Sequence, residues 1–250
     1  MRVARVYTPQ KLAPNARVVL EPAASHHVTA VLRARPGASL VLFDGDDRAI
    51  DARIKSADHR KGVIAVTAGE FLPPTAVVLE TILGLAITRP NAMAEAIQKA
   101  TELGVTCIQP LLTERAQARL VPPRLLSRWR QITIASCEQC GRNRLPELPE
   151  PQEFDEWIRN PGSPNRLLLS TRTREPLAAV PPPTGSIAVA VGPEGGFSAA
   201  EERDALARGF IAVSLGPRVL RAETAPVAGL AIIQSLWGDL GLAPLPESAG

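Results

Sequence analysis

The feature that most limits the fold is a change in hydrophobic pattern after Pro73-Pro74. Beyond it, apolar runs of strand length alternate with segments of helical period, from VVLETILGLAI to a last helix that ends near Leu240. Alternating strands and helices are typical of a parallel sheet covered by helices on both faces. The pattern therefore predicts an α/β domain over residues 75–243.

The residues before this point have a different pattern. Residues 2 to about 72 contain five β-type segments, VARVYT, ARVVLE, SLVLFDG, AIDARIKSA and GVIAVTAG, with one helix predicted from about Ala24 to Arg35. Pro36-Gly37 and Asp44-Gly45-Asp46 are turn signals between them. Short strands separated by turns predict a small β-barrel domain over residues 1–72.

Composition excludes several classes of protein. The chain has 250 residues, 45% of them apolar, which is enough for a core in one large or two ordinary domains. No window approaches the roughly 18 apolar residues of a membrane span, and MRVARVYTPQ lacks the apolar core of a signal peptide. Three cysteines fit reduced thiols. We therefore expect a cytoplasmic protein with no membrane partner.

The basic residues are mostly arginines, with 24 arginines and four lysines. A GC-rich genome favours arginine codons, which is one explanation. The other is that arginines gathered on one surface bind phosphates, because the guanidinium group matches phosphate oxygens bidentately. Composition leaves both open.

A glycine-rich stretch, Val191-Gly-Pro-Glu-Gly-Gly-Phe197, lies between an apolar run and a polar one. Ser198 and Glu201 have the spacing of a capping box, so a helix is predicted from Ala199 to Arg208. Open α/β sheets bind ligands at such strand-to-helix turns, and glycines let a ligand approach the backbone. A tight turn without a ligand is the alternative. The dinucleotide fingerprint, the phosphate loop and the nucleophile elbow are all absent.

A second loop of this kind follows the strand AVSLG and reads GPRVLRAETA, residues 216–225. It carries two arginines and a glutamate, and Thr224 is expected to cap the final helix. Two adjacent strand-end loops can form one pocket. The final helix, PVAGLAIIQSLW, is apolar almost all round, so it is expected to be buried within the domain or against a second copy.

These motifs resemble the SPOUT superfamily of knotted methyltransferases, and specifically the ribosomal RNA small subunit methyltransferase E family. GPEGG and LGPRVLRAETA carry the resemblance, together with HHVTAVLRARPG, LVLFDG, AIQKATELGV and SCEQCGRNRLPE, over Arg2 to Leu240. It implies a homodimer that transfers a methyl group from S-adenosyl-L-methionine to N3 of a uridine in 16S rRNA of the small ribosomal subunit. It also implies a PUA-like RNA-binding barrel and a C-terminal trefoil knot, a rarity that segment patterns cannot predict.

The resemblance also implies a set of site residues. Arg221, Glu223 and Arg142 are the candidate catalytic residues, and Arg142 would hold the nucleotide together with Asn143. The expected cofactor-binding residues are Leu169, Ser170, Gly192, Pro193, Glu194, Gly195, Gly196, Leu215, Gly216, Val219, Leu220, Thr224 and Ala225. RNA binding is expected from Arg5, Arg33, Arg35, Arg142, Asn143 and Arg144. The competing interpretations are core packing for the leucines, a helix-start role for Glu223 and a solvated surface for each arginine.

The chain departs from the family at one place. The usual Lys-Gly-x-Arg-Met-Glu run is Arg89-Pro-Asn-Ala-Met-Ala94 here, so Ala92 and Ala94 replace an arginine and a glutamate. Arg89 is a partial substitute for the lysine. The function of this loop is therefore in question.

Cys137 and Cys140 have C-x-x-C spacing, but a zinc site needs more ligands. Cys107, His26, His27 and His59 form no second ligand pair, so no metal is expected. The cysteine pair ends a helix, where the dipole opposes thiolate formation. His26-His27 favours a surface or RNA contact.

Three other functions compete with uridine-N3 methylation. They are a methyltransferase for another RNA position such as a ribose 2′-hydroxyl, a non-catalytic rRNA-binding factor and a C-x-x-C oxidoreductase. The sequence leaves open the proton acceptor, the RNA features recognised, and naked RNA or assembled subunits as substrate.

Overall fold

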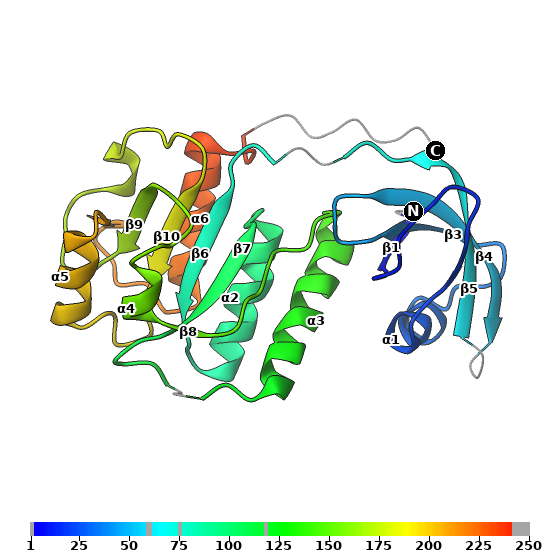
Figure 1. Ribbon diagram of the computed structural model, residues 1–250, viewed down its shortest axis with the longest axis horizontal. Helices are drawn as coiled ribbons and strands as arrows, with labels where there is room; N and C mark the ends of the chain where they lie inside the picture. Colours follow the sequence, from blue (N-terminus) through cyan, green and yellow to red (C-terminus); the bar gives the residue numbers. More distant parts are fainter. Residues whose placement is uncertain (1–2, 59–61, 75–76, 118–119, 242–250) are drawn as a thin grey trace. The chain divides into compact units, whose positions relative to one another are not determined.

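The computed structural model describes residues 3–58, 62–74, 77–117 and 120–241 (Figure 1). The chain divides into two compact units, one made of Met1–Ala76 and Ile134–Leu145 and the other of Val77–Thr133 and Pro146–Gly250. The sequence pattern did not predict that residues 134–145 join the first unit. The predicted domain ends at residues 1 and 243, and His59, lie outside the described residues.

The first unit contains a five-stranded sheet in the order β1-β3-β4-β5-β2. Its strands are β1 (Ala4–Tyr7), β2 (Arg17–Val19), β3 (Ser39–Phe43), β4 (Ala49–Asp58) and β5 (Gly62–Phe71), in the five predicted segments. β1 and β3 pair in parallel, and the other pairs are antiparallel. Leu40, Leu42, Ile50 and Ile54 are buried in its main core. Val41 and Phe43, on the other face of β3, pack in a second cluster with Ala49 and Cys137, so β3 is buried on both faces.

The helix expected from Ala24 to Arg35 is right in kind and wrong in extent. α1 (Pro22–His26) is followed by a π-helical turn, η1 (His27–Val31). Pro22 lies in the first turn, where its fixed φ suits a helix start. Arg33 has a positive φ of 51°, so helical geometry cannot continue to Arg35.

The second unit contains a six-stranded sheet in the order β11-β9-β10-β6-β7-β8. Every pair in it is parallel, which confirms the predicted α/β class. Its strands are β6 (Thr81–Ala86), β7 (Cys107–Leu112), β8 (Gln152–Glu153), β9 (Asn165–Leu169), β10 (Ile187–Val191) and β11 (Ile211–Val213).

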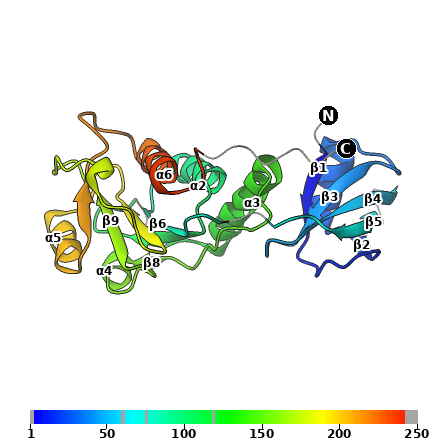
Figure 2. The same ribbon diagram turned by 90° about the horizontal axis from the view of Figure 1, so that it is seen from above.

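Helices cover both faces of this sheet. α2 (Pro90–Glu102) and α6 (Thr224–Trp237) lie on one face, and α4 (Phe154–Trp157) and α5 (Ala199–Ala207) lie on the other (Figure 2). The remaining helical segments are α3 (Pro123–Cys140), which is divided between the units, and the 3₁₀ turn η2 (Leu177–Ala179). The sequence pattern did not predict β8 and α4, because elements of two and four residues are too short to show periodicity.

Side chains of β10 alternate between two cores. Val189 and Val191 pack in the cluster that includes Met93 and Ile97 of α2. Ala188 and Ala190 face a second cluster, which includes Phe197. A strand buried on both faces reads as the continuous apolar run IAVAV. None of the described helices has the length and hydropathy of a membrane span.

Candidate functional site: a cavity at the carboxyl ends of the parallel strands

The glycine loop follows β10, and its backbone geometry explains two of its glycines. A Cβ atom on Gly192 would lie 3.1 Å from the Phe197 nitrogen and 3.2 Å from the carbonyl carbon of Gly196. Gly196 has a φ of +64°, which residues with side chains rarely adopt. The loop therefore folds back on itself so tightly that side chains at these positions would clash or be strained.

The predicted capping box ends the loop. The Glu201 N–H donates to Ser198 Oγ at 3.2 Å, and the Ser198 N–H donates to Glu201 Oε2 at 2.8 Å. This reciprocal pair starts α5 at Ala199 and orients the chain as it leaves the loop.

Three arginines from neighbouring strand-end loops hold the glycine loop. Arg89 Nε lies 3.2 Å from Glu194 Oε1, and Arg115 donates a hydrogen bond of 2.7 Å to the Gly195 carbonyl oxygen. Arg172 donates to the Phe197 carbonyl oxygen at 3.2 Å. Neither Arg115 nor Arg172 belongs to a motif, so no role was predicted for them from the sequence. Together they support a loop that has few side chains of its own.

The pKa of Glu194 is lowered overall. Burial acts to raise it, but hydrogen bonds from the backbone N–H groups of Glu194 and Arg89, together with the Arg89 guanidinium, outweigh burial. Glu194 is therefore held as a carboxylate. Arg89 thus has a defined partner at the place where the chain departs from the family pattern.

The second loop, after β11, is fastened to the loop after β9. The Ser214 N–H donates to the Glu175 carbonyl oxygen at 2.7 Å, and the Leu177 N–H donates to the Ser214 carbonyl oxygen at 3.1 Å. The expectation that Thr224 caps the final helix is wrong. Glu223 is the N-cap residue, with no side-chain cap, and Thr224 is the first residue of α6.

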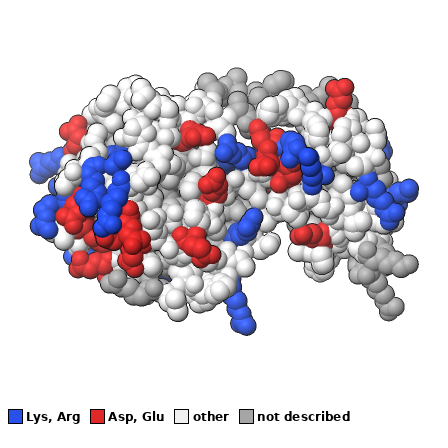
Figure 3. Space-filling view, in the orientation of Figure 1, with Lys and Arg blue, Asp and Glu red and all other residues white. Residues whose placement is uncertain are grey.

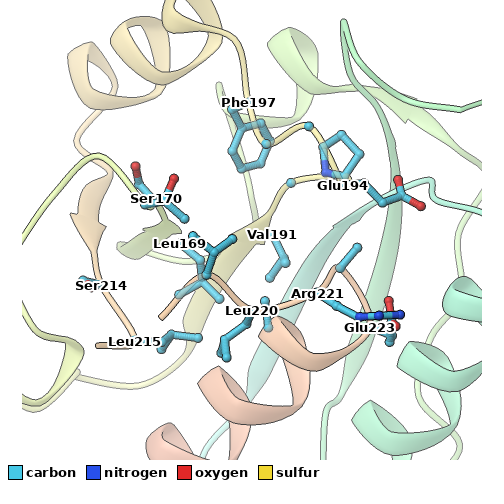
Figure 4. Close-up of a pocket in the computed structure, with 18 of the residues that line it drawn as sticks. Leu169, Ser170, Val191, Glu194, Phe197, Ser214, Leu215, Leu220, Arg221 and Glu223 are labelled. Carbon is cyan, nitrogen blue, oxygen red and sulfur yellow. The ribbon is translucent and has the colours of Figure 1, made fainter. Parts of the chain in front are cut away.

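A cavity of about 1610 Å³ lies among these loops, wholly within the second unit (Figure 4). The predicted residues that line it are Leu169, Ser170, Gly192, Pro193, Glu194, Gly195, Gly196, Leu215, Gly216, Val219, Leu220, Arg221, Glu223 and Ala225. Thr224 is not among the lining residues. Lining residues that sequence reasoning missed include Arg89, Glu95, Arg172, Arg174, Phe197, Glu202, Ser214 and Arg218. Phe197 and Arg218 lie in the two loops that the sequence singled out, whereas Glu95 and Glu202 lie in helices and carry no motif.

The cavity has an apolar part and a charged part. Val191, Leu169 and Leu220 lie in the middle of Figure 4, between Ser170 on one side and Arg221 with Glu223 on the other. Gly229 of α6 permits close approach here, since a Cβ atom on it would lie 3.1 Å from Leu169 Cδ1. The site can thus take a ligand with an apolar ring and polar edges.

The four carboxylates that line the cavity divide into two pairs. Glu194 interacts with Arg89, and Glu202 interacts with Arg172 and accepts a hydrogen bond from Ser170 Oγ. Glu95 and Glu223 make no ion pair with any residue that the structure describes. These two are the carboxylates available to accept a proton.

The structure places the other predicted site residues in the first unit. Arg5 donates to Asn143 Oδ1 and to the Arg142 carbonyl oxygen, and its guanidinium lies 5.2 Å from the Phe43 ring centre. Asn143 is 4% exposed, so little of its side chain is accessible to a ligand. Arg144 forms backbone bridges with Gly45 and Asp46. The segment after α3 is thus integrated into this unit.

Arg33 and Arg35 are exposed in the same unit. Both follow η1, and Arg33 itself has a left-handed backbone conformation. Within the described residues, neither arginine takes part in the hydrogen bonds that join Arg5 to the segment after α3.

The three cysteines are buried or partly buried, and the thiol pKa values of Cys137 and Cys107 are raised. The hydrogen bond with Cys140 and then burial raise the pKa of Cys137, and burial raises the pKa of Cys107 to about 11. A reactive dithiol needs the opposite shift. Groups of three or more possible metal ligands are also absent from the part of the chain that the structure describes.

Comparison with known proteins gives consistent matches over nearly the whole chain. Residues 76–234 match the RNA methyltransferase domain family, and residues 20–67 match the RNA methyltransferase PUA domain family. Ribosomal RNA small subunit methyltransferase E of Buchnera aphidicola subsp. Schizaphis graminum is 30% identical over 96% of this chain and 98% of its own length. The Synechocystis protein of the same name is 34% identical over 92% of this chain and 77% of its own.

Solved structures agree. Ribosomal RNA small subunit methyltransferase E from Neisseria gonorrhoeae, bound to S-adenosyl methionine, has a TM-score of 0.89 and 37% identity, covering 95% of this chain and 99% of that one. A Legionella pneumophila protein with the bound cofactor SAM has a TM-score of 0.90 and 37% identity, covering 94% of this chain and 98% of that one.

Proposed function

Because this chain belongs to the ribosomal RNA small subunit methyltransferase E family, we propose that it methylates N3 of a uridine in 16S rRNA. It is an rRNA methyltransferase that uses S-adenosyl-L-methionine. The observation that carries the proposal is the cavity of about 1610 Å³ at the ends of β9, β10 and β11. Typical single-ligand sites are about 300–1,000 Å³, so this one has room for a cofactor and a nucleotide together.

The lining residues fit the cofactor. The side chains of Leu169, Leu215 and Leu220 offer apolar surface to an adenine ring, and main-chain groups of the glycine loop can meet its polar edge. The close backbone of that loop depends on Gly192 and Gly196. When bound, the cofactor supplies a methyl group already activated on a sulfonium sulfur.

The residues of this chain have two tasks in the proposed reaction. The bond from uridine N3 to the methyl carbon forms as the sulfur–methyl bond breaks, and the N3 proton must leave. Holding the two reactants in line can lower the barrier by roughly 7–11 kcal/mol. The second task is to favour the deprotonated base, which electrostatics and a proton acceptor can do.

We assign the second task to Arg221 and Glu223. Both line the cavity beside the apolar floor, and neither makes an ion pair with a described residue. The Arg221 guanidinium would stabilise the uridine anion. Glu223 would accept the N3 proton, because Glu194 and Glu202 are committed to arginines. Glu95 is the competing acceptor.

The remaining parts of the proposal rest on the family. They are a C-terminal trefoil knot, a PUA-like barrel over residues 1–72, a methyltransferase domain over residues 75–243, a homodimer and a cytoplasmic location. RNA contacts by Arg33, Arg35, Arg142 and Arg144 belong with them. Leu236 of α6 is 46% exposed in the single chain, which supports a partner on that helix. A monomer in sedimentation at micromolar concentration would count against the dimer.

The test is to incubate the protein with labelled S-adenosyl-L-methionine and small subunits that lack the modification, then identify the labelled nucleoside by mass spectrometry. 3-Methyluridine is the expected product. Another methylated nucleoside would refute the N3 assignment. No label on subunits or on naked RNA would favour a non-catalytic binder.

Three variants, Arg221→Ala, Glu223→Gln and Glu95→Gln, then separate the catalytic candidates. The variant that removes the proton acceptor should lower kcat strongly and change KM little.

A further inference from the structure

Five arginines line the cavity, and they fall into two groups. Arg89 pairs with Glu194, and Arg172 pairs with Glu202. Arg174, Arg218 and Arg221 make no ion pair or side-chain hydrogen bond with any residue that the structure describes. Two lining carboxylates, Glu95 and Glu223, are also without an ion pair among the described residues, so the unpaired arginines outnumber the unpaired carboxylates by one.

Arg174 and Arg218 lie on two loops that are joined to each other. Glu175, next to Arg174, accepts a hydrogen bond of 2.7 Å from the Ser214 N–H through its carbonyl oxygen. Ser214 Oγ in turn accepts a hydrogen bond of 3.1 Å from the Gly216 N–H, two residues before Arg218. The loop that carries Arg174 is thus bonded to the start of the loop that carries Arg218.

Both arginines face solvent at the edge of the cavity. Their side chains are exposed, and the neighbouring Val219 is 81% exposed. On the face shown in Figure 3, the surface around α4 and α5 carries acidic and basic side chains interspersed, so charge of a single sign does not cover that face. The two unpaired, exposed arginines are therefore a local feature of the cavity edge.

We infer that Arg174 and Arg218 form a phosphate-binding subsite for the RNA strand that enters the cavity. The inference rests on the proposed function, since it concerns the substrate of the same site. Exposed guanidinium groups bind phosphodiester oxygens bidentately and fix the strand, without reading its sequence. The subsite would hold the backbone beside the target nucleotide while Arg221 acts on the base.

A carboxylate is the competing oxyanion, because the cofactor carries one. The position of both side chains at the solvent edge favours a ligand that arrives from solution and continues outside the cavity, as an RNA strand does. The two sources differ in a measurable way. Phosphate contacts make RNA affinity depend on salt, whereas a cofactor contact changes cofactor affinity.

The experiment measures the affinity of in vitro transcribed, unmodified 16S rRNA over a series of salt concentrations. The variants are Arg174→Ala, Arg218→Ala and the double variant, with Arg203→Ala as the control. Arg203 is also an exposed arginine of the second unit, on α5, and does not line the cavity. Each lost phosphate contact should reduce the slope of log K against log salt by about 0.7. Arg174→Lys and Arg218→Lys should restore most of the slope.

For the double variant, we expect the slope of log K for RNA against log salt to be smaller by about 1.4. Its affinity for the cofactor, measured by calorimetry, should stay within twofold of that of the parent protein. Unchanged slopes would overturn the inference, and so would a tenfold loss of cofactor affinity with unchanged RNA binding. These results are independent of the nucleoside made. If the parent protein methylates another position, the N3 assignment fails while the slopes still decide the phosphate subsite.

Discussion

The Arg115 guanidinium donates a hydrogen bond of 2.7 Å to the main-chain carbonyl oxygen of Gly195. This contact joins the loop after β7 to the loop after β10, across the intervening β6. Gly195 has no side chain with which to fix itself. An arginine from a separate loop therefore sets the conformation of a segment whose backbone is expected to meet the cofactor.

Arg115→Ala should weaken cofactor binding without unfolding the protein. A hydrogen bond to a charged group contributes about 1.5–3 kcal/mol, and exposure reduces this to about 1 kcal/mol, which is roughly a fivefold change in affinity. Isothermal titration with S-adenosyl-L-methionine measures the change. Arg124→Ala, an exposed arginine of α3 outside the cavity, is the control. Equal affinities in the two variants would contradict a role for Arg115 in holding the loop.

Gly192→Ala should disrupt the loop more severely. The new Cβ atom would lie 3.1–3.2 Å from backbone atoms of Gly196 and Phe197, and backbone cannot move aside as a flexible side chain can. Overpacking of this kind costs about 1–3 kcal/mol. We expect a lower Tm and at least tenfold weaker cofactor binding. Gly241→Ala, whose Cβ atom would meet nothing within 4 Å, should leave both unchanged.

Arg5→Ala should lower stability, because Arg5 contacts Asn143, the Arg142 carbonyl oxygen and the Phe43 ring. Loss of these contacts should reduce the free energy of unfolding of the first unit by about 1–3 kcal/mol. Urea denaturation measures it, with the exposed Arg33→Ala as control. A stable Arg5→Ala variant that binds RNA weakly would instead support the RNA contact expected from the sequence.

Glu138→Gln should change how stability depends on pH. Burial raises the pKa of Glu138 above 4.5, although the Tyr7 N–H, His27 and Arg5 act to lower it. A carboxyl group whose pKa is higher in the folded than in the unfolded protein stabilises the fold at pH values below its unfolded-state pKa. This contribution is lost as the pH rises through the folded-state pKa. The Tyr7 N–H donates a hydrogen bond of 3.0 Å to Glu138 Oε1. Glutamine keeps an oxygen that accepts this bond, and it does not ionise.

The Tm of Glu138→Gln should therefore exceed that of the parent protein at pH 7 and approach it at pH 4. Thermal scans at both pH values test this. Glu70→Gln, an exposed position on β5, should show no such difference. A Glu138→Gln variant that is less stable at pH 7 would show that the ionised carboxylate stabilises the fold.

Periodicity was sufficient for much of the architecture. The alternation of strands and helices after Pro74 and the capping box at Ser198 depend on interactions between residues close in sequence, and both have the predicted form. β8 and α4 could not be predicted, because neither is long enough for a period. Thr224 has the residue type of a cap, but the turn from Arg221 places it inside the helix.

The sequence by itself determined the parallel α/β class and most residues of the two loops that line the cavity, since strand ends in such a sheet converge at one edge. Tertiary structure alone decided which charges stay free. Arg172 and Arg174 are two residues apart in one loop, yet Arg172 is paired with Glu202 and Arg174 has no partner among the described residues. Pairing depends on what the fold brings within about 4 Å, and Glu202 lies 30 residues away along the chain.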